Sequence, residues 1–179
     1  MASKRLRRAA AMALALGLAW GVPLTAQTAM RAGSALVGRV APELVRTDLG
    51  GRRVDLKALR GKVVLLNFWA TWCGPCKVEL PKFAAWQREY GAQGLRVIAA
   101  SMNDTQAPVR RYADGLRPGF PVVMGDAKMG RAYGGVLGLP VTFLIRRDGR
   151  IAARVDGGAD LPAMEREVKK LLAEHGNGR

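Results

Sequence analysis

The feature that most constrains this chain is its pair of cysteines, which lie three positions apart in the segment Trp72-Cys73-Gly74-Pro75-Cys76. This segment follows a nearly continuous apolar run at residues 62–69, rich in strand-forming side chains, which predicts a central strand covered on both faces. From residue 74 to about residue 90, apolar side chains recur with a helical period. The cysteines are therefore expected where a buried strand ends and a helix begins.

Two thiols with this spacing at a strand–helix junction can close a small disulfide ring and open it again. Cys73 is expected at the helix N-terminus, where unsatisfied backbone N–H groups and the helix dipole favour an anion and so lower the pKa of the thiol. We therefore predict that Cys73 is the attacking thiolate. Cys76, one turn further into the helix, should be more shielded and act as the resolving thiol.

Three other uses of the cysteines compete with this interpretation. A structural zinc site needs four ligands, and the chain has two cysteines and one histidine, His175, which argues against zinc. A permanent disulfide suits an exported protein, but so short a loop constrains the unfolded chain little. Cu(I) could bind two thiolates, although no further His or Met is placed in the sequence to complete such a site. No metal and no cofactor are expected.

The rest of the chain predicts strands that alternate with helices. Gly50-Gly51 joins two short strands at 43–49 and 52–56 in a hairpin. Further strands are predicted at 95–102, 120–124, 141–146 and 151–155, and helices at a segment ending near 116, at 127–133 and from Asp160 to Gly176. This order, which ends in an antiparallel strand pair, predicts an α/β fold with a mixed sheet between helices.

The N-terminus has the pattern of an export signal. Residues 1–29 combine a basic start, a short apolar stretch and small residues, which indicates a signal peptide or an uncleaved N-terminal anchor. Residues 30–39 are predicted to be a linker, 40–176 one folded domain, and 177–179 a polar tail. An exported location in the periplasm or cell envelope follows, with a possible anchor in the inner membrane.

The formal net charge is +15, which raises the question of an anionic partner. The Lys and Arg residues are dispersed along the chain, with no run of five and no aromatic residues interleaved with a basic stripe. This distribution favours a solvated basic surface over a nucleic-acid site or a membrane-binding patch. We expect no nucleic-acid partner and membrane contact only through an N-terminal anchor.

Two segments of the chain resemble the TlpA/ResA-like family of the thioredoxin-like superfamily. They are Asn67-Phe-Trp-Ala-Thr-Trp-Cys-Gly-Pro-Cys-Lys-Val-Glu-Leu-Pro81 and Gly138-Leu-Pro-Val-Thr-Phe-Leu-Ile145. The similarity extends from about Val40 to His175. It implies a thioredoxin-like three-layer sandwich, in which a mixed central sheet has helices on both faces, with an N-terminal β-hairpin extension.

The resemblance also implies a client-binding site around the cysteines. In the family, the proline matching Pro140 is cis and packs beside the cysteines, so that the backbone of Leu139 is free to pair with an extended client peptide. Trp72, Gly74 and Pro75 are the other expected substrate-binding residues. The alternative for Pro140 is an ordinary proline at the entry of a strand.

A third catalytic residue follows from the same resemblance. Cytoplasmic thioredoxins carry a buried aspartate at the position that Asn67 occupies in this chain. The amide of Asn67 cannot accept a proton as that carboxylate does. The family resemblance supplies Glu79 as the substitute, three residues beyond Cys76. Shielding of this carboxylate would raise its pKa and let it move a proton during exchange. The alternative is that Glu79 is a solvated helix residue.

The resemblance implies an exported thiol-disulfide oxidoreductase. The Gly-Pro pair between the cysteines is associated with reductants, so the expected direction is reduction, with electrons from a membrane donor of the CcdA or DsbD type. Expected clients are apocytochrome c, before haem attachment, or copper-site proteins. The alternatives are a Cu(I) carrier and a peroxiredoxin-like peroxidase, and the latter would need Pro and Thr where this chain has Leu66 and Ala70.

Overall fold

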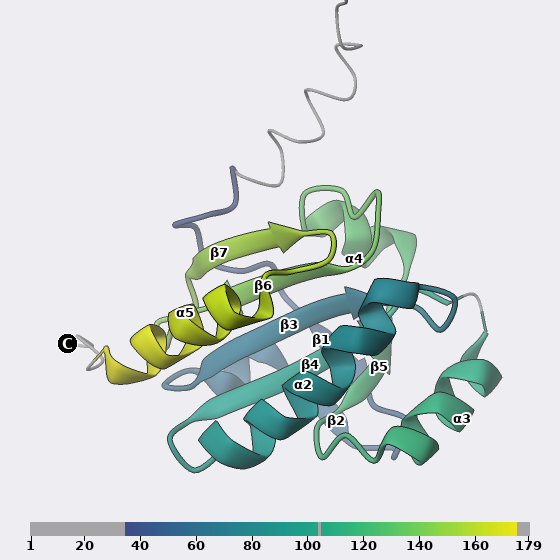
Figure 1. Ribbon diagram of the computed structural model, residues 1–179. Helices are drawn as coiled ribbons and strands as arrows, with labels where there is room; N and C mark the ends of the chain where they lie inside the picture. Colours follow the sequence, from purple (N-terminus) through teal and green to yellow (C-terminus); the bar gives the residue numbers. More distant parts are fainter. Residues whose placement is uncertain (1–34, 104, 175–179) are drawn as a thin grey trace, which may run out of the picture.

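The computed structural model describes residues 35–103 and 105–174 of the chain. Its centre is a sheet of five strands in the order β5-β4-β3-β6-β7 (Figure 1). The strands are β3 (Val63–Trp69), β4 (Leu95–Ser101), β5 (Val122–Met124), β6 (Val141–Ile145) and β7 (Ile151–Asp156). β3 and β4 pair in parallel, as do β4 and β5, whereas β6 pairs antiparallel with both β3 and β7. The sheet is mixed, as the sequence predicted.

Helices cover both faces of this sheet. They are α2 (Gly74–Tyr90), α3 (Gln106–Leu116), α4 (Ala127–Ala132) and α5 (Leu161–Ala173). Successive residues of β3 point to opposite faces, for example Leu65 to the core beneath α2, α3 and α5, and Leu66 to the core shared with α4. α2 and α5 lie on the near side of the sheet in Figure 1. The predicted three-layer, thioredoxin-like arrangement is confirmed.

The predicted N-terminal hairpin is present and is shorter than expected. Its strands are β1 (Val45–Thr47) and β2 (Arg53–Asp55), followed by the 3-10 turn η1 (Leu56–Leu59). The carboxylate of Asp48 accepts hydrogen bonds from the backbone N–H groups of Gly50 and Arg52, both at 2.8 Å. This wider turn takes up residues that the sequence pattern assigned to strands. The hairpin joins the edge of the central sheet, where the N–H of Leu49 donates to the carbonyl of Val122.

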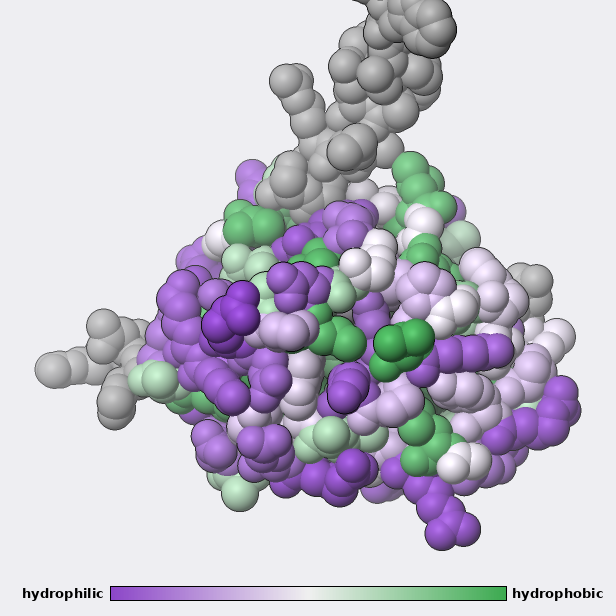
Figure 2. All heavy atoms as spheres, viewed as in Figure 1, coloured by the Kyte–Doolittle hydropathy of each residue, from purple (hydrophilic) through white to green (hydrophobic). Residues whose placement is uncertain are grey.

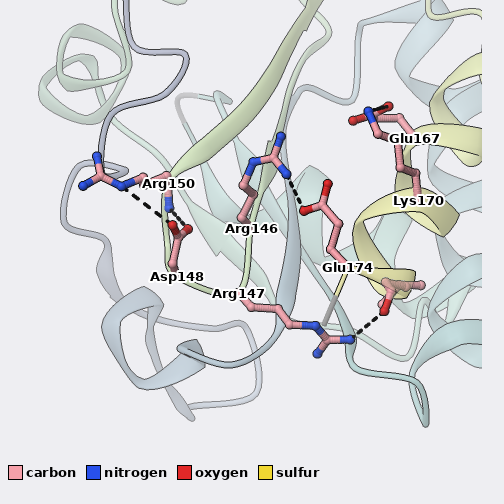
Figure 3. A network of polar contacts seen from close by, with 8 residues as sticks. Arg146, Arg147, Asp148, Arg150, Glu167, Lys170 and Glu174 are labelled. Carbon is pink, nitrogen blue, oxygen red and sulfur yellow. Dashed lines mark hydrogen bonds and ion pairs between the residues drawn. The ribbon is translucent and has the colours of Figure 1, made fainter. Parts of the chain in front are cut away.

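Polar contacts fix the end of α5 to the turn between β6 and β7 (Figure 3). Arg146 forms an ion pair with Glu174. The guanidinium of Arg147 donates to the carbonyl of Leu172 at 3.0 Å and to that of Gly61 at 2.8 Å. Because β6 is antiparallel to β3, this network lies at the end of the sheet where β3 begins. The segment with the cysteines follows the opposite end of β3.

Parts of the predicted domain organisation lie outside the described residues. These are the signal or anchor at 1–29, the polar tail at 177–179, and Gly176, the predicted end of the last helix. Within the predicted linker, Gly38 donates to the carbonyl of Ile151 and Ile151 donates to that of Arg39, both at 2.8 Å, so this part lies against β7. In the described part of the chain, no helix combines the length and apolar character needed to cross a membrane.

Candidate active site

The two cysteines lie at the junction that the sequence predicted. The start of α2 is next to the arrowhead of β3 in Figure 1, and a short turn connects them, in which the N–H of Cys73 donates to the carbonyl of Ala70 at 3.1 Å. Cys73 is the N-cap of α2, and its sulfur accepts a hydrogen bond from the N–H of Cys76 at 3.3 Å. Pro75 suits the first turn of a helix, where its missing N–H would have no intrahelical partner.

Cys73 and Cys76 are joined by a disulfide bond, with their Cα atoms 5.3 Å apart. Cys73 is 5% exposed, whereas Cys76 is completely buried. Both cysteines are therefore buried, and Cys73 is the one of the pair that keeps some contact with solvent. This difference in access matches the roles expected for an attacking and a resolving thiol.

Glu79 is a buried residue of α2, so the alternative of a solvated helix residue is wrong. Its Oε1 accepts a hydrogen bond from the N–H of Ala159 at 2.9 Å. Its Oε2 is also buried and has no hydrogen-bond partner within residues 35–103 and 105–174. Burial removes the carboxylate from water and raises the pKa of Glu79 above the ordinary value of 4.5, although the bond from Ala159 opposes this shift.

Asn67 occupies the middle of β3 beneath α2 and is completely buried. Its Nδ2 donates to Oγ1 of Thr142, the residue paired with it on β6, at 2.9 Å. An amide does not titrate in the range where thiols exchange, so Asn67 cannot replace an acid there. Besides Glu79, the buried carboxylate in the described residues is Asp48, in the hairpin. Glu79 is thus the buried acid of the cysteine helix.

The peptide bond between Leu139 and Pro140 is cis, as the resemblance implied. Pro140 is buried just before β6, and Leu139 packs against the cores on both faces of the sheet. Among the described residues, no hydrogen bond involves the backbone of Leu139. Leu139 itself lies in a bend, two residues before β6 begins.

The connection between β7 and α5 joins three parts of this site, and the sequence did not predict it. The N–H of Gly157 donates to the carbonyl of Pro140 at 2.9 Å. A Cβ atom placed on Gly158 would lie 3.7 Å from the Cβ of Pro75. The next residue, Ala159, makes the hydrogen bond to Glu79. The adjacent glycines after a strand were the available signal, because they permit close approach of the backbone.

Large apolar side chains are exposed on the segment that carries the cysteines and on the loop before Pro140. Among the described residues, six large apolar side chains are exposed, and three of them are Trp72 at 70%, Val78 at 64% and Leu137 at 79%. Val78 is one helical turn beyond Gly74, and Leu137 belongs to the loop that leads to Pro140. In the view of Figure 2, hydrophobic residues form small groups among hydrophilic ones. Val78 and Leu137 were missed because periodicity identifies only the buried stripe of a helix and says nothing of a loop.

No group of three or more His, Cys, Asp and Glu side chains that could hold a metal ion is found in residues 35–103 and 105–174. His175 lies outside these residues. The candidate site is made up of the two sulfurs, the buried carboxylate of Glu79, Trp72, the cis-proline loop and the turn before α5. Such a set of groups can exchange a disulfide and move the accompanying proton.

Comparison with known proteins supports this chemistry. The AhpC/TSA family model matches residues 37–154. Thiol-disulfide oxidoreductase ResA from Bacillus thuringiensis (strain Al Hakam) is 35% identical over 135 residues, which cover 75% of this chain and 78% of the relative. ResA from Bacillus subtilis (strain 168) is 38% identical over 121 residues, covering 67% of each chain.

A solved structure agrees with the sequence comparisons. The crystal structure of a thiol:disulfide interchange protein of the thioredoxin family, from Chlorobium tepidum TLS, superimposes with a TM-score of 0.70 at 27% identity, covering 75% of this chain and 96% of that chain. The resemblance inferred from the cysteine segment and the Pro140 strand is thus confirmed by both kinds of comparison. With these similarities over most of the residues that the structure describes, the chain belongs to the ResA-like thiol-disulfide oxidoreductases of the AhpC/TSA family.

Proposed function

We propose that the protein reduces disulfide bonds in exported client proteins, with Cys73 as the attacking thiol. The observation that carries this proposal is the disulfide between Cys73, the slightly exposed N-cap of α2, and Cys76, which is completely buried. A completely buried thiol cannot attack a client directly. It can attack its bonded neighbour, and this is the step that releases a reduced client.

The reaction transfers one electron pair. In the reduced protein, the thiolate of Cys73 attacks a client disulfide, the client S–S bond breaks, and a mixed disulfide forms while one client sulfur leaves as a thiolate. Cys76 then loses its proton and attacks the sulfur of Cys73. The mixed disulfide breaks, the second client thiolate leaves, and the ring between the two cysteines closes. The client gains two electrons and, from solvent and protein, two protons.

Glu79 is proposed to accept the proton of Cys76. The two residues are three positions apart on α2, and both are buried, so their side chains are neighbours on the helix surface. Burial raises the pKa of Glu79, which makes its ionised form a stronger base than an exposed glutamate. Its Oε2, without a partner in the described part of the chain, is available for the proton.

Client binding is assigned to the surface around Cys73. Trp72, Gly74, Pro75, Leu139 and Pro140 were predicted from the sequence, and we add the exposed side chains of Val78 and Leu137 to this set. An exposed apolar surface next to a reactive group favours clients with apolar residues beside their disulfide, since burial of these residues contributes to binding. The free backbone of Leu139 favours a client that is extended at this point.

The finer assignments come from the resemblance. The Gly-Pro pair between the cysteines supports reduction as the physiological direction. A membrane protein of the CcdA or DsbD type is the proposed electron donor, because each cycle leaves Cys73 and Cys76 oxidised. Apocytochrome c and copper-site proteins are the proposed clients. The basic and apolar pattern of residues 1–29 supports export to the periplasm or cell envelope. This segment is proposed to be either a cleaved signal or an anchor to the inner membrane. Residues 40–176 are the proposed functional domain.

The reduction potential of the Cys73–Cys76 pair tests the direction. The protein is equilibrated with thiol–disulfide buffers, and the oxidised fraction is measured by alkylation and mass spectrometry. A reductant requires a potential below about −250 mV, whereas a value near that of strong oxidants, roughly −120 mV, contradicts the proposal.

The two alternatives predict different results. Leu66 and Ala70, which stand where a peroxidase would need Pro and Thr, are buried apolar residues and offer no hydroxyl to hold a peroxide. Peroxide should therefore oxidise Cys73 no faster than a free thiol of the same ionisation. A Cu(I) carrier would bind copper through both sulfurs and would form no mixed disulfide with a client when Cys76 is replaced by Ala.

A further inference from the structure

We propose that Asn103 is a positioning residue that holds the turn before Cys73 in the shape required for exchange with a client. Asn103 lies just after β4 and is not part of the cysteine segment. Nothing in the sequence pattern singled it out. The inference rests on the proposed role of Cys73 as the attacking thiol and concerns what fixes that sulfur in place.

The side-chain amide of Asn103 binds Thr71 at two points. The backbone N–H of Thr71 donates to Oδ1 of Asn103 at 2.9 Å. Nδ2 of Asn103 donates to Oγ1 of Thr71 at 2.8 Å. Two hydrogen bonds between the same pair of residues fix orientation as well as distance. Thr71 is therefore held both through its backbone and through its side chain.

Asn103 is itself fixed to the sheet. The hydroxyl of Ser101 donates to Oδ1 of Asn103 at 2.9 Å, and the N–H of Asn103 approaches Oγ of Ser101 at 3.3 Å. Ser101 is completely buried and is paired with Trp69, the last residue of β3. The hydrogen bonds from Ser101 to Asn103 and from Asn103 to Thr71 thus connect the ends of two central strands to the turn that carries Trp72 and Cys73.

The two ends of this turn, Ala70 and Cys73, are packed in the core, whereas the segment between them is less buried. The internal hydrogen bond of the turn is the one from Cys73 to the carbonyl of Ala70, and Trp72 is mostly exposed to solvent. In the oxidised protein the disulfide ring also restrains Cys73. Reduction opens the ring, so the hydrogen bonds from Asn103 should matter most when the thiolate of Cys73 must stay at the N-terminus of α2, where the helix dipole stabilises it.

The chain offers a matched control for this idea at the other end of β4. Gln87 is also an amide side chain that binds backbone groups, since its Oε1 accepts from Val97 at 2.8 Å and its Nε2 donates to the carbonyl of Leu95 at 3.4 Å. Replacing Gln87 by Ala removes two hydrogen bonds of a similar kind, far from the cysteines. If Asn103→Ala acts only by lowering stability, the reactivity of Cys73 should change in Gln87→Ala as well. If it acts through positioning, that reactivity should change only in Asn103→Ala.

The experiment measures alkylation of Cys73 by iodoacetamide in the reduced protein, from pH 5 to 9. Asn103→Ala should slow alkylation at neutral pH by about fivefold and move the pH profile upward, because the thiolate loses part of its stabilisation by the helix N-terminus. Gln87→Ala should leave the rate and the profile unchanged. Thr71→Val, which removes only the hydroxyl, should slow alkylation by a smaller factor, and Thr71→Ser should restore it.

The outcomes separate this inference from the proposed function. If Asn103→Ala folds and its profile matches that of the unmodified protein, the positioning role is wrong while the role of Cys73 stands. If Asn103→Ala does not fold, the two Thr71 variants provide the test. Equal rates of Cys73 alkylation in Thr71→Val and Thr71→Ser would then overturn the inference. If Cys73 of the unmodified protein reacts no faster than Cys76, the proposed function itself fails.

Discussion

Glu79 and Ala159 are joined by a hydrogen bond of 2.9 Å, in which the N–H of Ala159 donates to Oε1 of the glutamate. This bond connects the helix that carries both cysteines to the turn before α5. The same turn contacts the cis-proline loop through Gly157 and lies beside Pro75 through Gly158. The buried acid is therefore held in a fixed place by one oxygen, while the other remains available for a proton.

Replacing Glu79 by Gln should slow the closure of the disulfide ring. The amide keeps an acceptor for Ala159 but cannot take the proton of Cys76, so the step should slow at least about tenfold. Decay of a mixed disulfide with a model peptide, measured by rapid acid quench and mass spectrometry, checks this. Glu89→Gln on the exposed side of the same helix is the control. Equal decay rates for Glu79→Gln and the unmodified protein would remove Glu79 from the mechanism.

The raised pKa of Glu79 also predicts how stability depends on pH. The folded protein keeps this proton above the ordinary pKa of 4.5, where the unfolded chain has lost it. The contribution of Glu79 to stability is therefore fully present below pH 4.5 and is lost as the pH rises through the folded pKa. Urea unfolding of the oxidised protein at several pH values should show this loss, and Glu79→Gln should lack it. A pH-independent difference between the two proteins would contradict the assignment.

Leu137 should determine which clients react well. Leu137→Ser removes an exposed apolar side chain near the cis-proline loop, which should lower kcat/KM by roughly tenfold for a disulfide peptide with apolar neighbours. A small disulfide without such neighbours should react at an unchanged rate. Val45→Ser, on the distant hairpin, serves as the control. An equal loss of rate for both substrates would indicate damage to the cysteines rather than loss of client binding.

Arg147 should support stability without any effect on the chemistry. Its guanidinium donates to carbonyl groups of three separate segments, at Gly61, Gln93 and Leu172. Arg147→Ala should lower the free energy of unfolding by about 1–2 kcal/mol, because charged donors would be lost from main-chain acceptors. Urea unfolding measures this change, and iodoacetamide alkylation should show unchanged reactivity of Cys73. A change in that reactivity would mean that the two ends of the sheet are coupled.

Much of the fold could be predicted from local patterns. The continuous apolar run of β3 and the helical period after Gly74 placed the cysteines correctly, because both patterns follow from burial of neighbouring residues. The hairpin was predicted with strands that are too long, since the Asp48 side chain replaces strand pairing by binding the turn. Such side-chain to backbone bonds compete with regular structure and leave little trace in an apolar pattern.

The candidate site could be predicted only where its residues are close in sequence. Cys73, Cys76 and Glu79 belong to one helix, and Pro140 was identified through its strand. The bond from Asn103 to Thr71 spans 32 residues and that from Ala159 to Glu79 spans 80. Contacts of this kind depend on how the elements pack, and periodicity carries no information on them. The exposure of Val78 and Leu137 was missed for the same reason.

In the proposed mechanism, Cys73 attacks a client disulfide and Cys76 then releases the client. The most direct test is the intact mass of reduced Cys76→Ala and Cys73→Ala variants after incubation with an oxidised Cys-x-x-Cys-His peptide, the sequence type of c-type haem attachment. We expect a one-to-one mixed disulfide on Cys73 of the Cys76→Ala variant, which dithiothreitol releases, and none on the Cys73→Ala variant. Formation of the adduct on Cys76 at a comparable rate, or on neither variant, would contradict this mechanism.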